Sequence, residues 1–113
     1  MHEYCITQSM LSLALDKAGT AEAVKITKIN LALGELSGIV DESVRFYFDF
    51  LSKGTVAAGA ALSFEKIITR LRCRKCDAVF CPPDGQWACP GCGEVSIEIL
   101  SGRECYLESI EVE

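Results

Sequence analysis

The stretch CRKCDAVFCPPDGQWACPGCG, residues 73–93, decides the fold, because it cannot belong to an ordinary apolar core. It holds five cysteines, three prolines and three glycines, and it lacks periodic apolar residues. Cys73 and Cys76 form one C-x-x-C pair, and Cys89 and Cys92 form a second pair after twelve intervening residues. Two residues between thiolates let a tight turn direct both sulfurs at one ion. Two such turns therefore predict a tetrahedral site of four sulfurs.

A closed site of four cysteines is structural by default, because it leaves no coordination position for a substrate. Zinc binding also explains how a segment with so few apolar residues can fold. It contributes roughly 10–16 kcal/mol of folding free energy in small finger peptides at neutral pH. Iron is the competing metal, because four-sulfur geometry does not distinguish the two ions. The sequence CPGCG at 89–93 also resembles the knuckle of rubredoxin, a one-iron electron carrier. Glycine at 93 suits a turn that needs a positive φ.

Three further cysteines bring the total to seven. Cys81 follows Cys76 after four intervening residues and could replace a ligand, but the two symmetric pairs favour a spare thiol near the site. Cys5 and Cys105 are expected to be small buried apolar residues. In a reducing compartment this cysteine pattern favours metal thiolates over disulfides.

The segments on either side of the cysteines predict alternating helices and strands. The expected helices are 3–19 and 41–54, and the expected strands are 27–33, 62–72, 94–100 and 104–113. Asp41 or Ser43 is the expected cap of the second helix. A bulge, or burial on both sides of the strand, is expected between Phe64 and Ile67, where the apolar alternation shifts.

These elements predict an α+β fold: a small, mainly antiparallel sheet with two helices on one face, plus an inserted zinc-ribbon-like module. The expected division is a discontinuous α/β domain at 1–71 and 101–113 and a metal module at 72–100. In the last strand, Tyr106, Ile110 and Val112 are expected on one side and Leu107 on the other.

The charge and hydropathy of the 113 residues exclude several classes of function. The net charge is −5, with 11 Lys and Arg against 16 Asp and Glu. This balance argues against a nucleic-acid partner, because phosphate binding needs a basic face. No apolar run approaches the roughly 18–20 residues that span a bilayer, and no signal peptide is recognisable. We therefore expect a cytoplasmic protein without a membrane anchor.

The opening residues Met1, His2 and Glu3 form a second candidate metal site, and His2 is the only histidine. Methionine before a large residue is normally retained. The amino group of Met1, the peptide nitrogen of His2 and its imidazole can then chelate one ion in a near-planar arrangement. Nitrogen-rich tetragonal sites suit Ni(II) or Cu(II). Glu3 adds a carboxylate that could bind the ion or support the ligands.

The chain resembles the HypA/HybF family of hydrogenase maturation factors over nearly its whole length. The matching segments are MHEYCITQSML at 1–11, LGELSGIVDESVRFYFDFLSKGT at 33–55, the segment 59–66, and the two C-x-x-C pairs with CPGCG. The resemblance implies a nickel metallochaperone in which His2 supplies the imidazole, Met1 the amine and Glu3 an adjacent ligand or support. It also implies that Cys73, Cys76, Cys89 and Cys92 hold structural Zn(II).

The resemblance further implies the partners. Proteins of this family deliver Ni(II) to the precursor of the [NiFe]-hydrogenase large subunit together with the GTPase HypB, and some serve urease maturation proteins. A further acidic nickel ligand has been suggested in some members, and Asp41 is the nearest candidate by residue type. The expected assembly is a monomer or a homodimer.

Two other functions remain open from the residues alone: a rubredoxin-like electron carrier and a zinc-ribbon interaction module without a second metal. An enzyme is not expected, because there is no second histidine to act as a base, no Ser/His/Asp set and no phosphate-binding glycine loop.

Overall fold

The structure is a computed structural model that describes residues 2–82 and 86–113, and of His2 the backbone alone. Within these described ranges, two helices and six strands follow one another. They are α1 (His2–Thr20), β1 (Ile26–Gly34), α2 (Asp41–Leu51), β2 (Ala61–Ile67), β3 (Arg70–Cys73), β4 (Val79–Phe80), β5 (Ile97–Ser101) and β6 (Cys105–Val112).

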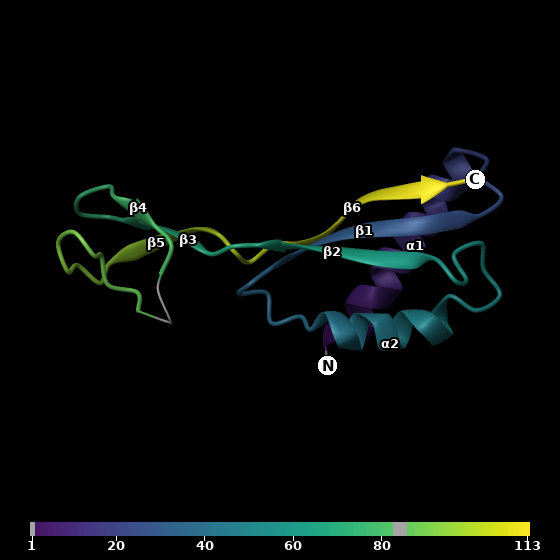
Figure 1. The fold of residues 1–113 in the computed structure, drawn as a ribbon, viewed down its shortest axis with the longest axis horizontal. Coiled ribbons are helices and arrows are strands. Elements are labelled where there is room, and N and C mark those ends of the chain that lie inside the picture. Colours follow the sequence, from purple (N-terminus) through teal and green to yellow (C-terminus); the bar gives the residue numbers. More distant parts are fainter. Residues whose placement is uncertain (1, 83–85) are drawn as a thin grey trace. The chain divides into compact units, whose positions relative to one another are not determined.

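The strands form two sheets of three strands each, with the orders β2-β1-β6 and β4-β3-β5 (Figure 1). The expected strand 62–72 is therefore two strands that belong to different sheets. The chain leaves the first sheet after Ile67 and begins β3 at Arg70. The shift in apolar alternation marks this break rather than a bulge within one strand.

The first sheet is mixed. Lys28 on β1 forms an ion pair with Glu111 on β6, and Asn30 Nδ2 on β1 donates to Ser109 Oγ on β6 at 3.0 Å. The residue numbers therefore rise along β1 while those of their partners on β6 fall. This is the antiparallel pattern. Strand β2 follows β1 through the helix α2, the connection typical of parallel neighbours.

One core lies between this sheet and the two helices. The inward side chains of β1, Ile29 and Leu31, join a single buried cluster with Met10, Leu11 and Ala14 of α1 and with Val44 and Phe48 of α2. Because both helices share one cluster with one face of the sheet, they cover the same face. The predicted α+β fold with two helices on one face and a cysteine module is confirmed.

Strand β6 departs from its expected pattern. Leu107 and Ile110 pack against the core, whereas Tyr106 and Val112 are exposed. The prediction that Leu107 lies on the side opposite Ile110 is wrong, because both pack against the core, and the side expected for Tyr106 and Val112 stays a prediction. Inward residues three positions apart require an interruption of the two-residue alternation.

Contacts between Cα atoms divide the chain into two compact units. The first unit contains Met1–Ala32, Ile39–Glu65 and Cys105–Glu113, and the second contains Leu33–Gly38 and Lys66–Glu104. The whole apolar cluster lies in the first unit. The functional division expected at residues 72 and 100 stays a prediction. Among the described residues, no helix is long and apolar enough to cross a membrane.

Candidate metal centre

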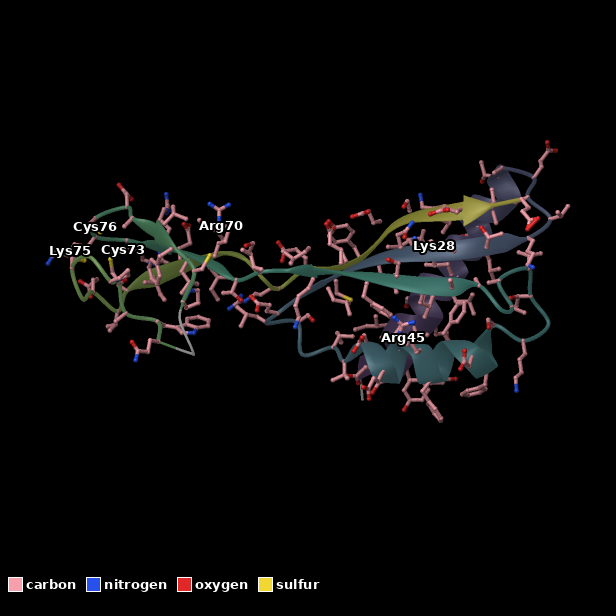
Figure 2. The ribbon with its side chains drawn as sticks, in the orientation of Figure 1. Lys28, Arg45, Arg70, Cys73, Lys75 and Cys76 are labelled. Carbon is pink, nitrogen blue, oxygen red and sulfur yellow. The ribbon has the colours of Figure 1, made fainter. Side chains whose placement is uncertain are left out.

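Four cysteine sulfurs meet in the second unit, beside the sheet β4-β3-β5. The Sγ atoms of Cys73, Cys76, Cys89 and Cys92 all lie within 4.8 Å of one another. Two of the separations, Cys73 to Cys92 and Cys76 to Cys89, are 3.6 Å. Cys73 is the last residue of β3, and Figure 2 shows it with Cys76 at the turn that follows.

The separations fit a tetrahedral metal. Zinc–sulfur bonds of about 2.3 Å place the corners of a tetrahedron about 3.8 Å apart. The two distances of 3.6 Å are close to this edge, and no disulfide joins any of the four cysteines. The donor set therefore suits one ion that prefers four thiolates, which zinc and iron both do.

The two C-x-x-C turns are backbone copies of each other. In the first, Cys73 N–H donates to Ala78 O and Cys73 O accepts from Asp77 N–H, both at 2.9 Å. In the second, Cys89 N–H donates to Glu94 O at 2.9 Å and Cys89 O accepts from Gly93 N–H at 2.8 Å. The bonds connect the same relative positions in both turns.

The fifth residue of each turn has a left-handed backbone conformation. Asp77 has φ 64° and Gly93 has φ 75°. The sequence predicts this conformation at Gly93 but not at Asp77. Aligning the two motifs, C-x-x-C-D and C-x-x-C-G, would have indicated it, because Asp77 takes the position of the glycine. Asp is among the few residues other than glycine that adopt it routinely.

Burial alternates within each pair. Cys73 and Cys89 are buried, whereas Cys76 and Cys92 are exposed. The buried first cysteine receives backbone hydrogen bonds on its sulfur, and Cys76 N–H donates to Cys73 Sγ at 3.5 Å. Donors of this kind stabilise a thiolate.

The thiol pKa values follow this asymmetry. The Cys76 N–H lowers the pKa of Cys73, and the Cys92 N–H lowers the pKa of Cys89 to about 7. The Ala78 N–H acts to lower the pKa of Cys76, but the thiols of Cys89 and Cys73 outweigh it and raise this pKa to about 12. A metal ion must therefore displace protons when it binds, because only thiolates are ligands.

The strands beside the site are held by an ion pair. Arg72 on β3 lies opposite Glu98 on β5, and its Nη2 donates to both carboxylate oxygens, at 3.0 Å to Oε2. Leu71 on the opposite side of β3 is fully buried. These contacts fix the strand that ends at Cys73.

The other three cysteines lie outside the cluster. Cys81, Cys5 and Cys105 are all exposed. The prediction that Cys5 and Cys105 are buried is therefore wrong. Cys5 lies on the same side of α1 as the exposed polar residues Ser9 and Ser12, and Cys105 opens β6 at an edge of the first sheet.

The second predicted site lies at the start of α1. Met1 and the side chain of His2 lie outside the described residues. Glu3 is in the first turn of α1, and its Oε2 accepts a hydrogen bond from Val40 N–H at 3.4 Å. Val40 is the N-cap of α2 and makes no side-chain cap of its own, so the prediction that Asp41 or Ser43 caps α2 is wrong. No sequence signal pairs residues 37 positions apart.

Comparison with known proteins gives one consistent result. The family model described as "Hydrogenase/urease nickel incorporation, metallochaperone, hypA" matches residues 1–112. A relative from Dehalococcoides mccartyi strain 195, named hydrogenase maturation factor HypA, is 45% identical over 100% of this chain and 95% of its own length. A relative of the same name from Caldanaerobacter subterraneus is 41% identical over 100% of both chains.

Solved structures agree. One, titled as the solution structure of HypA protein, has a TM-score of 0.77 and 27% identity, covering 100% of this chain and 97% of that one. Another, titled as the Ni metallochaperone HypA from Helicobacter pylori, has a TM-score of 0.67 and 25% identity, covering 97% of this chain and 96% of that one.

Proposed function

This chain belongs to the HypA family of hydrogenase/urease nickel incorporation metallochaperones, and from this membership we propose that it binds Ni(II) at its amino terminus and delivers it for maturation of [NiFe]-hydrogenase. The extent of the family match carries the proposal. Because it spans residues 1–112, it includes Met1, His2 and Glu3 as well as the four clustered cysteines.

The nickel ligands in this proposal are the amino group of Met1 and the peptide nitrogen and imidazole of His2. These nitrogens offer the tetragonal donor set that Ni(II) accepts. Glu3 contributes as an adjacent ligand or as a support. A site with few protein ligands leaves coordination positions open, so a receiving protein can supply ligands and take the ion.

The four cysteines hold a structural Zn(II) in this proposal. Zinc supplies no redox chemistry and closes its coordination shell with four thiolates. The residues of this chain position the sulfurs through the paired turns and direct backbone N–H groups at Cys73 and Cys89. The chain acts as a carrier rather than a catalyst, in the cytoplasm, with the GTPase HypB and the hydrogenase large subunit precursor as partners.

Nickel titration of the zinc-loaded chain tests the proposal. We expect His2→Ala to weaken nickel binding by at least about 100-fold, because a chelate ring and an imidazole are lost together. An added residue before Met1 should also weaken it, because the amine becomes an amide. Gln8→Ala, on an exposed position of α1, is the matched control. Equal nickel affinity of His2→Ala and the parent would disprove the site.

Metal analysis separates the remaining alternatives. One zinc per chain in colourless protein supports the structural site. A red protein with one iron would instead favour the rubredoxin-like carrier, because an Fe(Cys)4 centre is coloured and redox-active.

A further inference from the structure

Strand β5 is an edge strand that its own residues leave unguarded. In the order β4-β3-β5 it pairs with β3 alone among the described residues, so the backbone groups on its outer side have no strand partner. Natural proteins usually guard such an edge with charged side chains or proline. The five residues of β5, IEILS, include one charged residue, Glu98, and Arg72 of β3 binds its carboxylate. The outer side of β5 is therefore open to a further strand.

A bulge redirects one apolar residue of this strand. Arg70 on β3 pairs with Ser101, but the next residue, Leu71, pairs with Ile99, so Leu100 is the extra residue between the two pairs. Bulges are frequent beside functional sites, where they redirect a side chain. Leu100 is 44% exposed. An open hollow of about 350 Å³ lies against this part of the strand and is lined by Ile99, Leu100, Ser101, Arg103 and Glu104.

Two apolar and two basic side chains surround Ser101, and we call them the β5 patch: Ile68, Arg70, Leu100 and Arg103. Arg70 is the partner of Ser101 across the strands, and Ser101 Oγ donates to Ile68 O at 2.8 Å. Leu100 precedes Ser101 in the chain, and Arg103 follows it closely. Ile68 is 52% exposed, and both arginines are exposed. The patch therefore offers apolar contact and positive charge together.

The two guanidinium groups of the β5 patch form no ion pair within the described part of the chain. Nearby carboxylates are directed at backbone groups instead. Glu35 Oε1 accepts from Thr69 N–H at 2.6 Å. Glu104 Oε1 accepts from Gly102 N–H, also at 2.6 Å. Figure 2 shows Arg70 pointing away from the ribbon. Because a guanidinium fork matches the geometry of a carboxylate, the patch suits a ligand that carries carboxylates.

The charge balance of the second unit permits such a ligand. This unit holds six Lys and Arg and six Asp and Glu, so the net charge of −5 belongs to the first unit. An acidic ligand is repelled by the first unit but not by the second. Electrostatic complementarity therefore favours the β5 patch over the surface of the first unit.

We propose that the β5 patch and the outer edge of β5 form a docking site for an extended acidic segment of another protein, in which carboxylates alternate with apolar residues. The segment adds a strand to the sheet β4-β3-β5, a common way for a peptide to bind an exposed edge. Successive side chains of a strand point to opposite faces, so all its carboxylates lie on one face. They bind Arg70 and Arg103, and an apolar side chain lies beside Leu100.

This docking site goes beyond the nickel function and does not depend on it. It contains neither a predicted nickel ligand nor any of the four clustered cysteines. The edge is only five residues long, so few main-chain hydrogen bonds are available to an added strand. Binding of an isolated segment is accordingly weak, because the segment must also be ordered when it binds.

A peptide titration of the full, zinc-loaded, ¹⁵N-labelled chain tests the proposal. The probe is the acetylated and amidated peptide VEVEVE. We expect a Kd of about 0.1–1 mM, with amide shifts confined to residues 66–73 and 96–104. Three matched peptides should each bind at least about tenfold more weakly. VKVKVK reverses the charge, SESESE lacks apolar side chains, and fully N-methylated VEVEVE lacks the backbone donors of a strand.

Charge-reversed variants test the named residues. Arg70→Glu and Arg103→Glu should each weaken VEVEVE binding about tenfold, because an attraction becomes a repulsion, and the double variant should prefer VKVKVK. Leu100→Ser should weaken binding about fivefold, because an apolar contact is lost. Lys25→Glu, the same change of charge at an exposed position of the first unit, is the matched control and should change the Kd less than about twofold. Circular dichroism and zinc content should stay at parent values.

Four results would overturn the proposal. They are the absence of shifts in β5 at about 5 mM VEVEVE, equal binding of VEVEVE and VKVKVK, and equal binding of VEVEVE by Arg103→Glu and the parent. The fourth is the same set of shifts with sodium acetate alone, which would reduce the site to a contact for small anions. Shifts in β5 that follow protein concentration without any peptide would assign the edge to a second copy of this chain and would equally contradict the proposal.

Discussion

At the scale of single residues, the two cysteine turns differ in how they reach the same backbone conformation. Gly93 has φ 75° and nothing within 4 Å of an added Cβ, so only backbone strain opposes a side chain there. We predict that Gly93→Ala costs about 1–2 kcal/mol, since a left-handed conformation is unfavourable for alanine by that amount. Competition with a chromophoric chelator should show zinc binding weakened about tenfold.

The first turn supplies the matched control. Asp77 already occupies the left-handed conformation at φ 64°, so Asp77→Gly removes strain while it adds freedom to the unfolded chain. The two effects oppose each other, and zinc affinity should change less than about threefold. A loss in Asp77→Gly equal to that in Gly93→Ala would show that the side chain of Asp77 has a role of its own.

The hydrogen bond that Glu3 makes indicates that this residue positions the start of α1. Its carboxylate accepts from Val40 N–H, so it ties the first turn of α1 to the start of α2. We predict that Glu3→Ala and Val40→Pro each weaken nickel binding about fivefold, the equivalent of one hydrogen bond of about 1 kcal/mol. Proline removes the N–H, and the backbone at Val40 must shift from φ −99° toward the value of about −65° that proline adopts.

The double variant decides how Glu3 acts. If the carboxylate works through Val40, the two substitutions remove the same interaction and their effects do not add. Calorimetric nickel titration of both single variants and the double variant measures this. A normal nickel affinity in Val40→Pro, together with a large loss in Glu3→Ala, would instead identify Glu3 as a direct ligand.

At the scale of elements, the end of β1 depends on a close approach between two backbones. A Cβ on Gly34 would lie 2.1 Å from Gly102 O, and Leu36 N–H donates to that same oxygen at 2.6 Å. We predict that Gly34→Ala destabilises the chain by about 1–3 kcal/mol, the usual cost of an overpacked site, because backbone atoms must move. Thermal unfolding of the zinc-loaded chain should show a lower midpoint.

Gly19 provides the opposite expectation. It lies in α1, and an added Cβ meets nothing within 4 Å. Gly19→Ala should therefore stabilise the chain by about 0.5–1 kcal/mol, because alanine has the higher helix propensity. The prediction for Gly34 fails if Gly34→Ala leaves the midpoint unchanged or raises it, and the prediction for Gly19 fails if Gly19→Ala lowers it.

The elements also show what the sequence could and could not predict. Both helices and the four-sulfur cluster were predictable, because helical periodicity and C-x-x-C spacing are local signals. The division of 62–72 into β2 and β3 was not, because apolar alternation shows burial but not the sheet that provides it. The Glu3–Val40 contact likewise joins distant positions, which no local pattern reports.

At the scale of the whole molecule, the two predicted metal sites belong to different compact units. Glu3 and the buried apolar cluster lie in the first unit, and the four cysteines lie in the second. The buried apolar side chains of the second unit are few, with Leu33 and Leu71 as the large ones. The first unit thus has a core of its own, and we predict that the second depends on a metal held by the four cysteines.

This contrast predicts the effect of metal removal. A chelator with a reducing agent should unfold residues 66–104, because the four cysteines are no longer joined through an ion and the remaining core is too small. Helices α1 and α2 should persist, since every residue they bury belongs to the first unit. Ellipticity at the helical minimum should therefore change little, while amide protection disappears across the second unit alone. Simultaneous loss of helix and metal would mean that the two units unfold as one cooperative structure, and nickel affinity would then fall with zinc content.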